Sequence, residues 1–160
     1  MTILPPRPLT KSRIANDVLA AKTMSAEDAA ALIPPNATIG MSGFTGSGYP
    51  KMVPLALAER IEAEHKAEHP FRVRILSGAS TGPELDGALA RADAIDFRLP
   101  YNSDPLLRDR INRGEMDYVD MHLSQVAPMV WEGLYGNLDY AVVEVSAITP
   151  EGGLVPSTSV

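Results

Sequence analysis

A glycine-rich stretch at residues 38–54 contains the first residues whose types and spacing suggest chemistry. Its sequence, TIGMSGFTGSGYPKMVP, places Gly40, Gly43, Gly46 and Gly48 between a β-branched lead-in and a helical pattern. Glycine lets the backbone adopt positive φ and lets a ligand approach the main chain closely. Backbone N–H groups at the start of the following helix can bind an anion. The stretch therefore predicts a ligand-binding loop at the carboxyl end of a strand, where open α/β sheets bind ligands.

The spacing of these glycines excludes two common phosphate-binding motifs. Gly43 and Gly48 have the separation found in a P-loop, but Tyr49 stands where the lysine is needed. The order of the glycines also differs from the dinucleotide fingerprint G-x-G-x-x-G. A plain strand–helix connection with extra glycines remains the alternative.

A second small-residue loop at residues 77–83 contains two neighbouring hydroxyl groups, Ser80 and Thr81. Neither lies in the G-x-S-x-G motif of a nucleophilic serine. A hydroxyl at the end of a strand more often caps the next helix or orders its loop. We therefore do not expect Ser80 to act as a nucleophile.

The histidines give little support for a metal site. His65 and His69 have the i, i+4 spacing of a zinc site, but Lys66 replaces the glutamate of a zincin. A solvated helix end is the better interpretation, and no metal is expected. His122, beside Asp120, is either a general base or a hydrogen-bonded structural residue.

Two further clusters leave their function open. Arg108, Arg110 and Arg113 share one predicted helix, which suits a phosphate site, a subunit interface or a mixed solvated surface. Trp131 lies in an apolar helical cluster, which favours a core or a subunit interface over a cofactor site.

The elements that must position these loops alternate between short apolar strands and helices. Strands are predicted at 38–41, 71–76, 94–98, 118–121 and 140–145, and helices at 11–23, 25–33, 51–65, 83–92, 105–113 and 124–134. Ser25, Asp104 (or Ser103) and Ser124 are the expected N-caps. This alternation is typical of βαβ units. The predicted fold class is therefore α/β, with an open, mainly parallel sheet and flanking helices.

Composition narrows the class of protein further. The 160 residues carry a net charge of −6 and are 45% hydrophobic, which suits one domain with a buried core. An acidic chain with no basic stripe is not expected to bind nucleic acid. The chain has no cysteine, no apolar run of membrane-spanning length and no signal-peptide pattern. We therefore expect a cytoplasmic protein that does not associate with membranes.

The two ends of the chain differ from its middle. Residues 1–16 are expected to form an extended, proline-rich arm, and residues 17–160 one α/β domain. A turn at 147–153 leads into a β-favouring run at 154–160. From that run we expect the domain to be the N-terminal part of a longer protein.

Six motifs follow one another along the chain: SGFTGSGYPK, GASTGPELDG, FRLPYNSD, RINRGE, HLSQV and AITPEGGLVPSTSV. In type and order they resemble the acetyl-CoA hydrolase/transferase family of class I CoA-transferases, which includes the succinyl-CoA:acetate CoA-transferases. The resemblance extends over nearly the whole chain from about Asp17 onward. Tyr101 and Ser103 depart from it, since similar sequences often have Phe and Thr there.

The resemblance implies a two-domain enzyme in which each domain is an open sheet of the CoA-transferase type. In this family a glutamate of the second domain attacks the acyl-CoA and forms an acyl anhydride, then a glutamyl-CoA thioester. The resemblance places that glutamate beyond Val160, so the chain alone is expected to be inactive. It also implies a CoA thioester as substrate with no permanently bound cofactor, a small carboxylate such as acetate or succinate as partner, and a homodimer.

The resemblance also implies site residues. Ser80 matches the position whose side chain lies against the catalytic glutamate and helps to place it. The other matching positions are Gly43, Phe44, Thr45 and Gly46 beneath the acyl pocket, Gly78, Ala79 and Thr81 around Ser80, and Asn102 at the rim. Two other functions stay open: a non-catalytic subunit of a split transferase, and a stand-alone module that binds a phosphorylated ligand.

Overall fold

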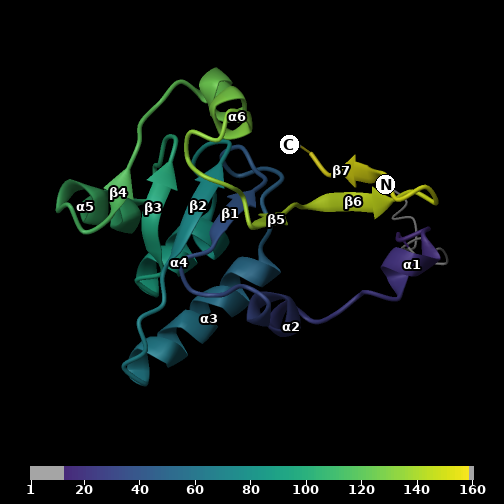
Figure 1. The fold of residues 1–160 in the computed structure, drawn as a ribbon, viewed down its shortest axis with the longest axis horizontal. Coiled ribbons are helices and arrows are strands. Elements are labelled where there is room, and N and C mark those ends of the chain that lie inside the picture. Colours follow the sequence, from purple (N-terminus) through teal and green to yellow (C-terminus); the bar gives the residue numbers. More distant parts are fainter. Residues whose placement is uncertain (1–12, 159–160) are drawn as a thin grey trace, which may run out of the picture.

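A five-stranded parallel sheet forms the centre of the protein (Figure 1). The structure is a computed structural model and describes residues 13–158. The strands are β1 (Thr38–Met41), β2 (Val73–Ser77), β3 (Ile95–Leu99), β4 (Asp117–Tyr118) and β5 (Tyr140–Val142). They lie in the order β4-β3-β2-β1-β5, and every pairing is parallel. The predicted open, parallel α/β fold is confirmed.

The helices cover the two faces of this sheet unequally. They are α2 (Ala26–Ala31), α3 (Met52–Lys66), η1 (Pro83–Gly87), α4 (Ala88–Arg91), α5 (Pro105–Asn112) and α6 (Leu123–Trp131). From β1 to β4 the chain moves in one direction across the sheet, so right-handed crossovers place α3, η1/α4 and α5 on one face. The return from β4 to β5 runs the other way and places α6 on the opposite face.

The larger core lies between the sheet and α3. One apolar face of α3 packs against the sheet: Leu57 and Ile61 are fully buried, and they join Ile39, Val73 and Ile75 in one cluster. Burying each such side chain contributes roughly 1.5–3 kcal/mol. The face under α6 has a much smaller cluster, centred on Leu76, Phe97 and Leu99.

A β-bulge in β3 decides which residues face which core. Val73 pairs with Ile95 and Arg74 pairs with Phe97, so Asp96 is the extra residue. The alternation of side chains shifts by one residue there. Ile95 therefore joins the larger core, whereas Phe97 joins the cluster under α6. Burial raises the pKa of the Asp96 carboxyl.

The terminal segments lie to one side of the sheet (Figure 1). β6 (Val145–Ile148) and β7 (Leu154–Pro156) form an antiparallel pair, and Ile14 makes a parallel bridge to Ile148. In the described part of the helix expected at 11–23, the structure has only α1 (Asp17–Ala20). The strand expected at 140–145 is divided between β5 and β6. Most of the expected 1–16 arm lies outside the described residues.

Four local predictions about helix starts have different outcomes. Ser25 caps α2 and Asp104 caps α5, each by accepting backbone N–H groups. The prediction for Ser124 is wrong, because His122 is the N-cap of α6 and accepts from the Ser124 N–H. The helix after Gly82 begins with Pro83 as expected, but its first five residues form a π-helix.

Candidate functional site

The loops after β1 and β2, at the carboxyl edge of the sheet, touch through their backbones. Gly43 lies in the loop after β1 and Gly78 in the loop after β2. An alanine Cβ at Gly78 would lie 2.7 Å from the carbonyl oxygen of Gly43, so only glycine fits. Gly43 has φ 127°, which other residues rarely adopt. A Cβ there would also lie 2.6 Å from Tyr49 Cβ.

Tyr49 fills the space beside these loops. It is 6% exposed, and its hydroxyl donates a 2.6 Å hydrogen bond to Glu84 Oε2. The ring lies against Gly82, where any Cβ would overlap the phenol. The hydrogen bond to Glu84 and burial together raise the pKa of Tyr49 to about 12. The same hydrogen bond lowers the pKa of Glu84. Tyr49 thus links the glycine-rich loop to the start of η1.

Ser80 lies below the surface of the second loop. It is 2% exposed, and its Oγ lies 2.6 Å from Ser103 Oγ. The Ser103 backbone N–H also donates to Ser80 Oγ, at 3.0 Å. Ser103 itself is exposed. An approaching group can therefore reach the Ser103 hydroxyl directly, whereas the Ser80 hydroxyl is buried behind it. The sequence had presented Ser103 only as an alternative N-cap and a departure from Thr.

A buried ion pair lies beneath Ser80. Asp86, in η1, and Arg98, in β3, both have fully buried side chains and approach to 3.1 Å. Asp86 Oδ2 accepts the Thr81 N–H at 2.7 Å, and Arg98 Nη2 donates to the Ala79 carbonyl at 3.0 Å. Asp86 and Arg98 lie within the motifs GASTGPELDG and FRLPYNSD, but the resemblance assigned neither of them a role. The signal that was available is the charged residue Arg98 at the end of a predicted strand, but Asp96 in the same strand is charged as well.

Asn102 directly precedes Ser103 in the chain but lines a different pocket from Gly43 and Gly78. It is 4% exposed, and its Oδ1 accepts the Asp104 N–H at 2.9 Å. Within residues 13–158 its Nδ2 has no hydrogen-bond partner, and neither has Thr81 Oγ1. Asn102 lines a pocket of about 200 Å³ together with Arg108 and Asp120.

A larger, mostly apolar pocket of about 560 Å³ lies where α6 covers the edge of the sheet. Gly43, Phe44 and Gly78 line it from the loop side, and Val130 and Trp131 line it from α6. Of the predicted site residues, only these first three line the pocket; Ala79, Ser80 and Thr81 lie in the adjoining loop. No carboxylate lines it in the described part of the chain.

Thr45 and Gly46 form the tip of the glycine-rich loop and do not line the apolar pocket. Phe44 and Ser47 exchange backbone hydrogen bonds of 3.0 and 3.1 Å, which closes a tight turn. Thr45 has φ 52°, an unfavourable value for a β-branched residue. Both tip residues are exposed, so the turn projects from the edge of the sheet.

Lys51 and Glu144 form a second link at this edge that the sequence did not indicate. Lys51 Nζ lies 2.6 Å from Glu144 Oε2, and the Ser157 hydroxyl donates to Glu144 Oε1 at 2.7 Å. These two hydrogen bonds lower the pKa of Glu144, with that of Lys51 the larger cause. The Glu144 N–H also donates to Ser42 Oγ at 2.9 Å. The carboxylate thus ties the glycine-rich loop to the segment after β7.

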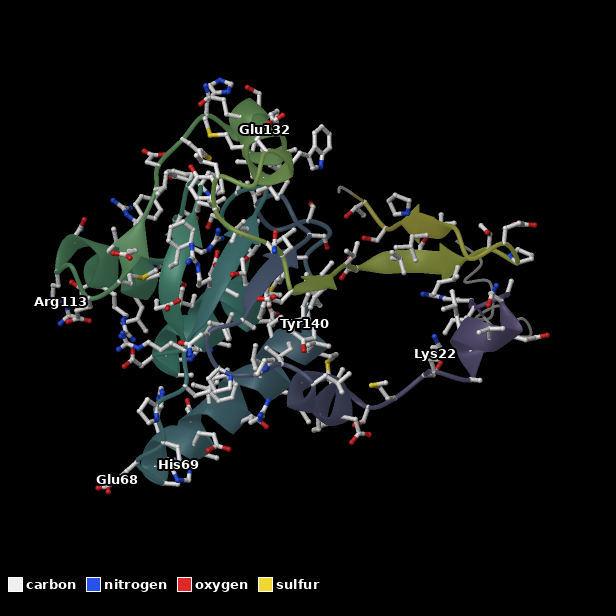
Figure 2. The ribbon with its side chains drawn as sticks, in the orientation of Figure 1. Lys22, Glu68, His69, Arg113, Glu132 and Tyr140 are labelled. Atoms are coloured by element: carbon white, nitrogen blue, oxygen red, sulfur yellow. The ribbon has the colours of Figure 1, made fainter. Side chains whose placement is uncertain are left out.

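The three histidines considered as site residues make hydrogen bonds within the fold. His65 Nε2 donates to the Phe71 carbonyl at 2.9 Å, and His69 Nδ1 lies 3.0 Å from Glu64. Figure 2 shows His69 at the far end of α3 from the carboxyl edge of the sheet. His122 is exposed and caps α6. Within residues 13–158, no group of three or more acidic or histidine side chains is arranged to hold a metal ion.

The arginines of α5 belong mainly to a mixed surface. Arg110 pairs with Asp93, and Arg113 pairs with Asp109 at 2.9 Å. Arg113 lies at the outer end of α5 (Figure 2). Trp131, expected in a core or an interface, is 82% exposed. None of the described helices is both long and apolar enough to span a bilayer.

Comparison with known proteins decides between the open alternatives at the level of family. Residues 9–160 match the family described as "Acetyl-CoA hydrolase/transferase N-terminal domain". This chain belongs to that family. The propanoyl-CoA:succinate CoA transferase of Escherichia coli is 44% identical over 81% of the chain, and the succinyl-CoA:acetate CoA-transferase of Clostridium kluyveri is 40% identical over 95%. An acetyl-CoA hydrolase of Schizosaccharomyces pombe is 36% identical over 95%.

Solved structures support the fold of this acetyl-CoA hydrolase/transferase N-terminal domain. RipA from Yersinia pestis matches with a TM-score of 0.57 at 18% identity, over 79% of this chain and 30% of that one. The acyl-CoA transferase YdiF from Escherichia coli matches with a TM-score of 0.52 at 16% identity, over 83% and 25%. The chain spans only 26%, 28% and 30% of the three relatives named above.

Proposed function

We propose that the complete protein is an acyl-CoA:carboxylate CoA-transferase and that this chain supplies one wall of its active site. The observation that carries the proposal is the family match over residues 9–160. Over their aligned stretches the two transferases named above are 44% and 40% identical to the chain, against 36% for the fission-yeast hydrolase. Acetyl-CoA hydrolase is the second candidate, because that relative is also similar over 95% of the chain.

The proposed reaction passes through a glutamate of a second domain, outside this chain. Its carboxylate attacks the acyl-CoA carbonyl and releases CoA thiolate, which leaves an acyl–glutamyl anhydride. The thiolate then attacks the glutamyl carbonyl, releases the donor carboxylate and forms a glutamyl-CoA thioester. The acceptor carboxylate reverses both steps, whereas water would hydrolyse the thioester. In this proposal the apolar pocket takes the acyl group, and its described lining contains no carboxylate.

In this proposal the loops of the chain shape the acyl side of the site. Gly43 and Gly78 present backbone rather than side chains to the pocket, and Phe44 and Trp131 border it. The Ser80–Ser103 hydroxyl pair places the incoming glutamate by hydrogen bonding, with Ser103 as the exposed member. Asn102 contributes from the neighbouring pocket through its unpartnered Nδ2.

An assay on the complete protein tests the proposal. Succinyl-CoA or propanoyl-CoA is incubated with and without acetate, and the acyl-CoA products are separated by chromatography. We expect acetyl-CoA to form only when acetate is present; thioester loss that carboxylate does not change would favour the hydrolase. Intact mass after acyl-CoA treatment should show one attached CoA, which acceptor carboxylate removes. No attached CoA would contradict the glutamyl-CoA intermediate.

The isolated chain provides a separate control. We propose that it is inactive, because its nucleophile lies elsewhere, and turnover by the chain alone would contradict this. Thermal stabilisation of the isolated chain by CoA would instead favour a stand-alone binding module. A cytoplasmic location and a homodimer are part of the same proposal, and sedimentation of the complete protein tests the dimer.

A further inference from the structure

We propose that Arg98 and Asp86 are positioning residues that fix Ser80 at the edge of the site. The inference rests on the proposed function, in which Ser80 helps to place the attacking glutamate. Both side chains are fully buried. Arg98 Nε donates to Asp86 Oδ1 at 3.1 Å, and Arg98 Nη2 donates to Asp86 Oδ2 at 3.2 Å. Such a two-pronged pair fixes orientation as well as distance.

The remaining hydrogen bonds of the pair hold the peptide groups on either side of Ser80. Arg98 Nη2 donates to the carbonyl of Ala79, the residue before Ser80, at 3.0 Å. Asp86 Oδ2 accepts the N–H of Thr81, the residue after it, at 2.7 Å. Arg98 Nη1 also donates to the carbonyl of Leu99 in its own strand. The pair thus connects β3 and η1 to the backbone around one serine.

Stability alone does not account for an ion pair at this place. Well-packed apolar residues of similar volume often stabilise a core as well as or better than a buried ion pair. An apolar pair, however, cannot hold the Ala79 carbonyl and the Thr81 N–H. The loop also contains Gly78 and Gly82, whose backbones have many alternative conformations. We infer that the pair removes this freedom.

The position of Ser80 matters because its hydroxyl has defined partners. Its Oγ accepts the Ser103 N–H at 3.0 Å and lies 2.6 Å from Ser103 Oγ. A shift of the loop would move both hydroxyl groups relative to the glutamate. A misplacement of about 1 Å at a reacting centre can reduce turnover by ~10²-fold.

Arg98→Lys in the complete protein is the first test. Lysine keeps the charge but cannot contact Asp86 and the Ala79 carbonyl in the same geometry. We expect kcat to fall by at least about tenfold with KM for the acyl-CoA little changed, in line with the cost of misplacement. Arg113→Lys is the matched control, because Arg113 pairs with Asp109 on the exposed surface of α5. Wild-type kcat in folded Arg98→Lys would overturn the proposal.

A double-mutant comparison separates positioning from general stability. If Arg98 acts through Ser80, the double variant Ser80→Ala with Arg98→Lys should have a kcat within about twofold of that of Ser80→Ala alone. A further loss of about tenfold would overturn the proposal. If Arg98→Lys does not fold, the apolar pair Arg98→Met with Asp86→Leu replaces it in the same comparison.

Hydrogen–deuterium exchange provides a readout that does not depend on activity. In Arg98→Lys, the backbone around Thr81 should exchange at least about tenfold faster than in the wild type, while α3 keeps its protection. Unchanged exchange around Thr81 would overturn the inference even if no transferase activity is found. Absence of turnover in the wild type, by contrast, counts only against the proposed function.

Discussion

Gly43 and Gly78 lie in direct backbone contact across two loops that are separated by the whole of α3 and β2. An alanine Cβ at Gly78 would lie 2.7 Å from the carbonyl oxygen of Gly43. A backbone atom cannot move aside as the end of a long side chain can. The glycines of these loops therefore allow close packing of the loops themselves, in addition to any contact with a ligand.

Gly78→Ala should destabilise the protein by about 1–3 kcal/mol, because the new methyl group overpacks the contact with Gly43. Urea unfolding followed by circular dichroism measures the change. Gly46→Ala is the matched control, since an added Cβ at Gly46 has no heavy atom within 4 Å. Equal unfolding midpoints for the two variants would contradict the close contact.

Tyr49 should make the protein sensitive to alkaline pH. Its pKa is raised to about 12, first by the hydrogen bond to Glu84 and then by burial. An unfolded tyrosine loses its proton near pH 10, so between about pH 10 and 12 only the unfolded state is deprotonated. The stabilisation is therefore complete below about pH 10 and is lost as pH rises through 12.

Absorbance titration and thermal unfolding together check this prediction. Tyr49→Phe should remove the tyrosine that titrates last and should flatten the loss of stability above pH 10. Glu84→Gln should lower the pKa of Tyr49 towards its usual value, because the acceptor charge is gone. An unchanged titration curve in Tyr49→Phe would show that another tyrosine titrates at the highest pH.

Truncation of the two aromatic residues Phe71 and Trp131 should change the stability of the protein by very different amounts. Phe71 is 2% exposed and packs in the larger core, whereas Trp131 is 82% exposed. Phe71→Ala should cost about 3–5 kcal/mol, and Trp131→Ala should change stability by no more than about 0.5 kcal/mol. Chemical unfolding of both variants measures the difference. A large loss for Trp131→Ala would mean that its ring is covered in solution.

Regular patterns in the sequence predicted the frame of the fold. Short apolar strands, the helix at 51–65 and the caps Ser25 and Asp104 depend on local spacing. The helix and both caps are confirmed, and the strands form with shifted bounds, the one expected at 140–145 being divided between β5 and β6. The glycine-rich loop after β1 was predicted as a ligand-binding loop because it follows the carboxyl end of a strand, where open α/β sheets bind ligands.

Features that depend on contacts between residues distant in the chain could not be predicted from local sequence patterns. The bulge at Asp96 changes which face the rest of β3 presents, and no local pattern marks it. Arg98 therefore meets Asp86, a partner 12 residues away in the chain. The cap of α6 was assigned to Ser124 from its residue type, whereas the imidazole of His122 reaches the N–H first. The exposure of Trp131 likewise depends on how little of the second face α6 covers.

Ser80→Ala is the variant that tests the assigned site most directly. The substitution removes one oxygen from a residue that is 2% exposed, so the backbone should keep its path. The Ser103 N–H loses its acceptor, and an unsatisfied donor costs about 1–3 kcal/mol when buried. Because Ser103 is exposed, water replaces part of that bond and the cost should lie near the lower end.

The kinetic effect of Ser80→Ala should exceed this small loss of stability. In the complete protein we expect kcat to fall by roughly 10- to 100-fold at temperatures well below the melting midpoint, because the hydroxyl pair no longer places the glutamate. Ser103→Ala is the matched comparison: it removes the other hydroxyl but leaves the Ser103 N–H bonded to Ser80 Oγ. A similar loss in Ser103→Ala would show that the exposed hydroxyl makes the contact and that Ser80 orients it. Wild-type kinetics in Ser80→Ala would remove Ser80 from the site.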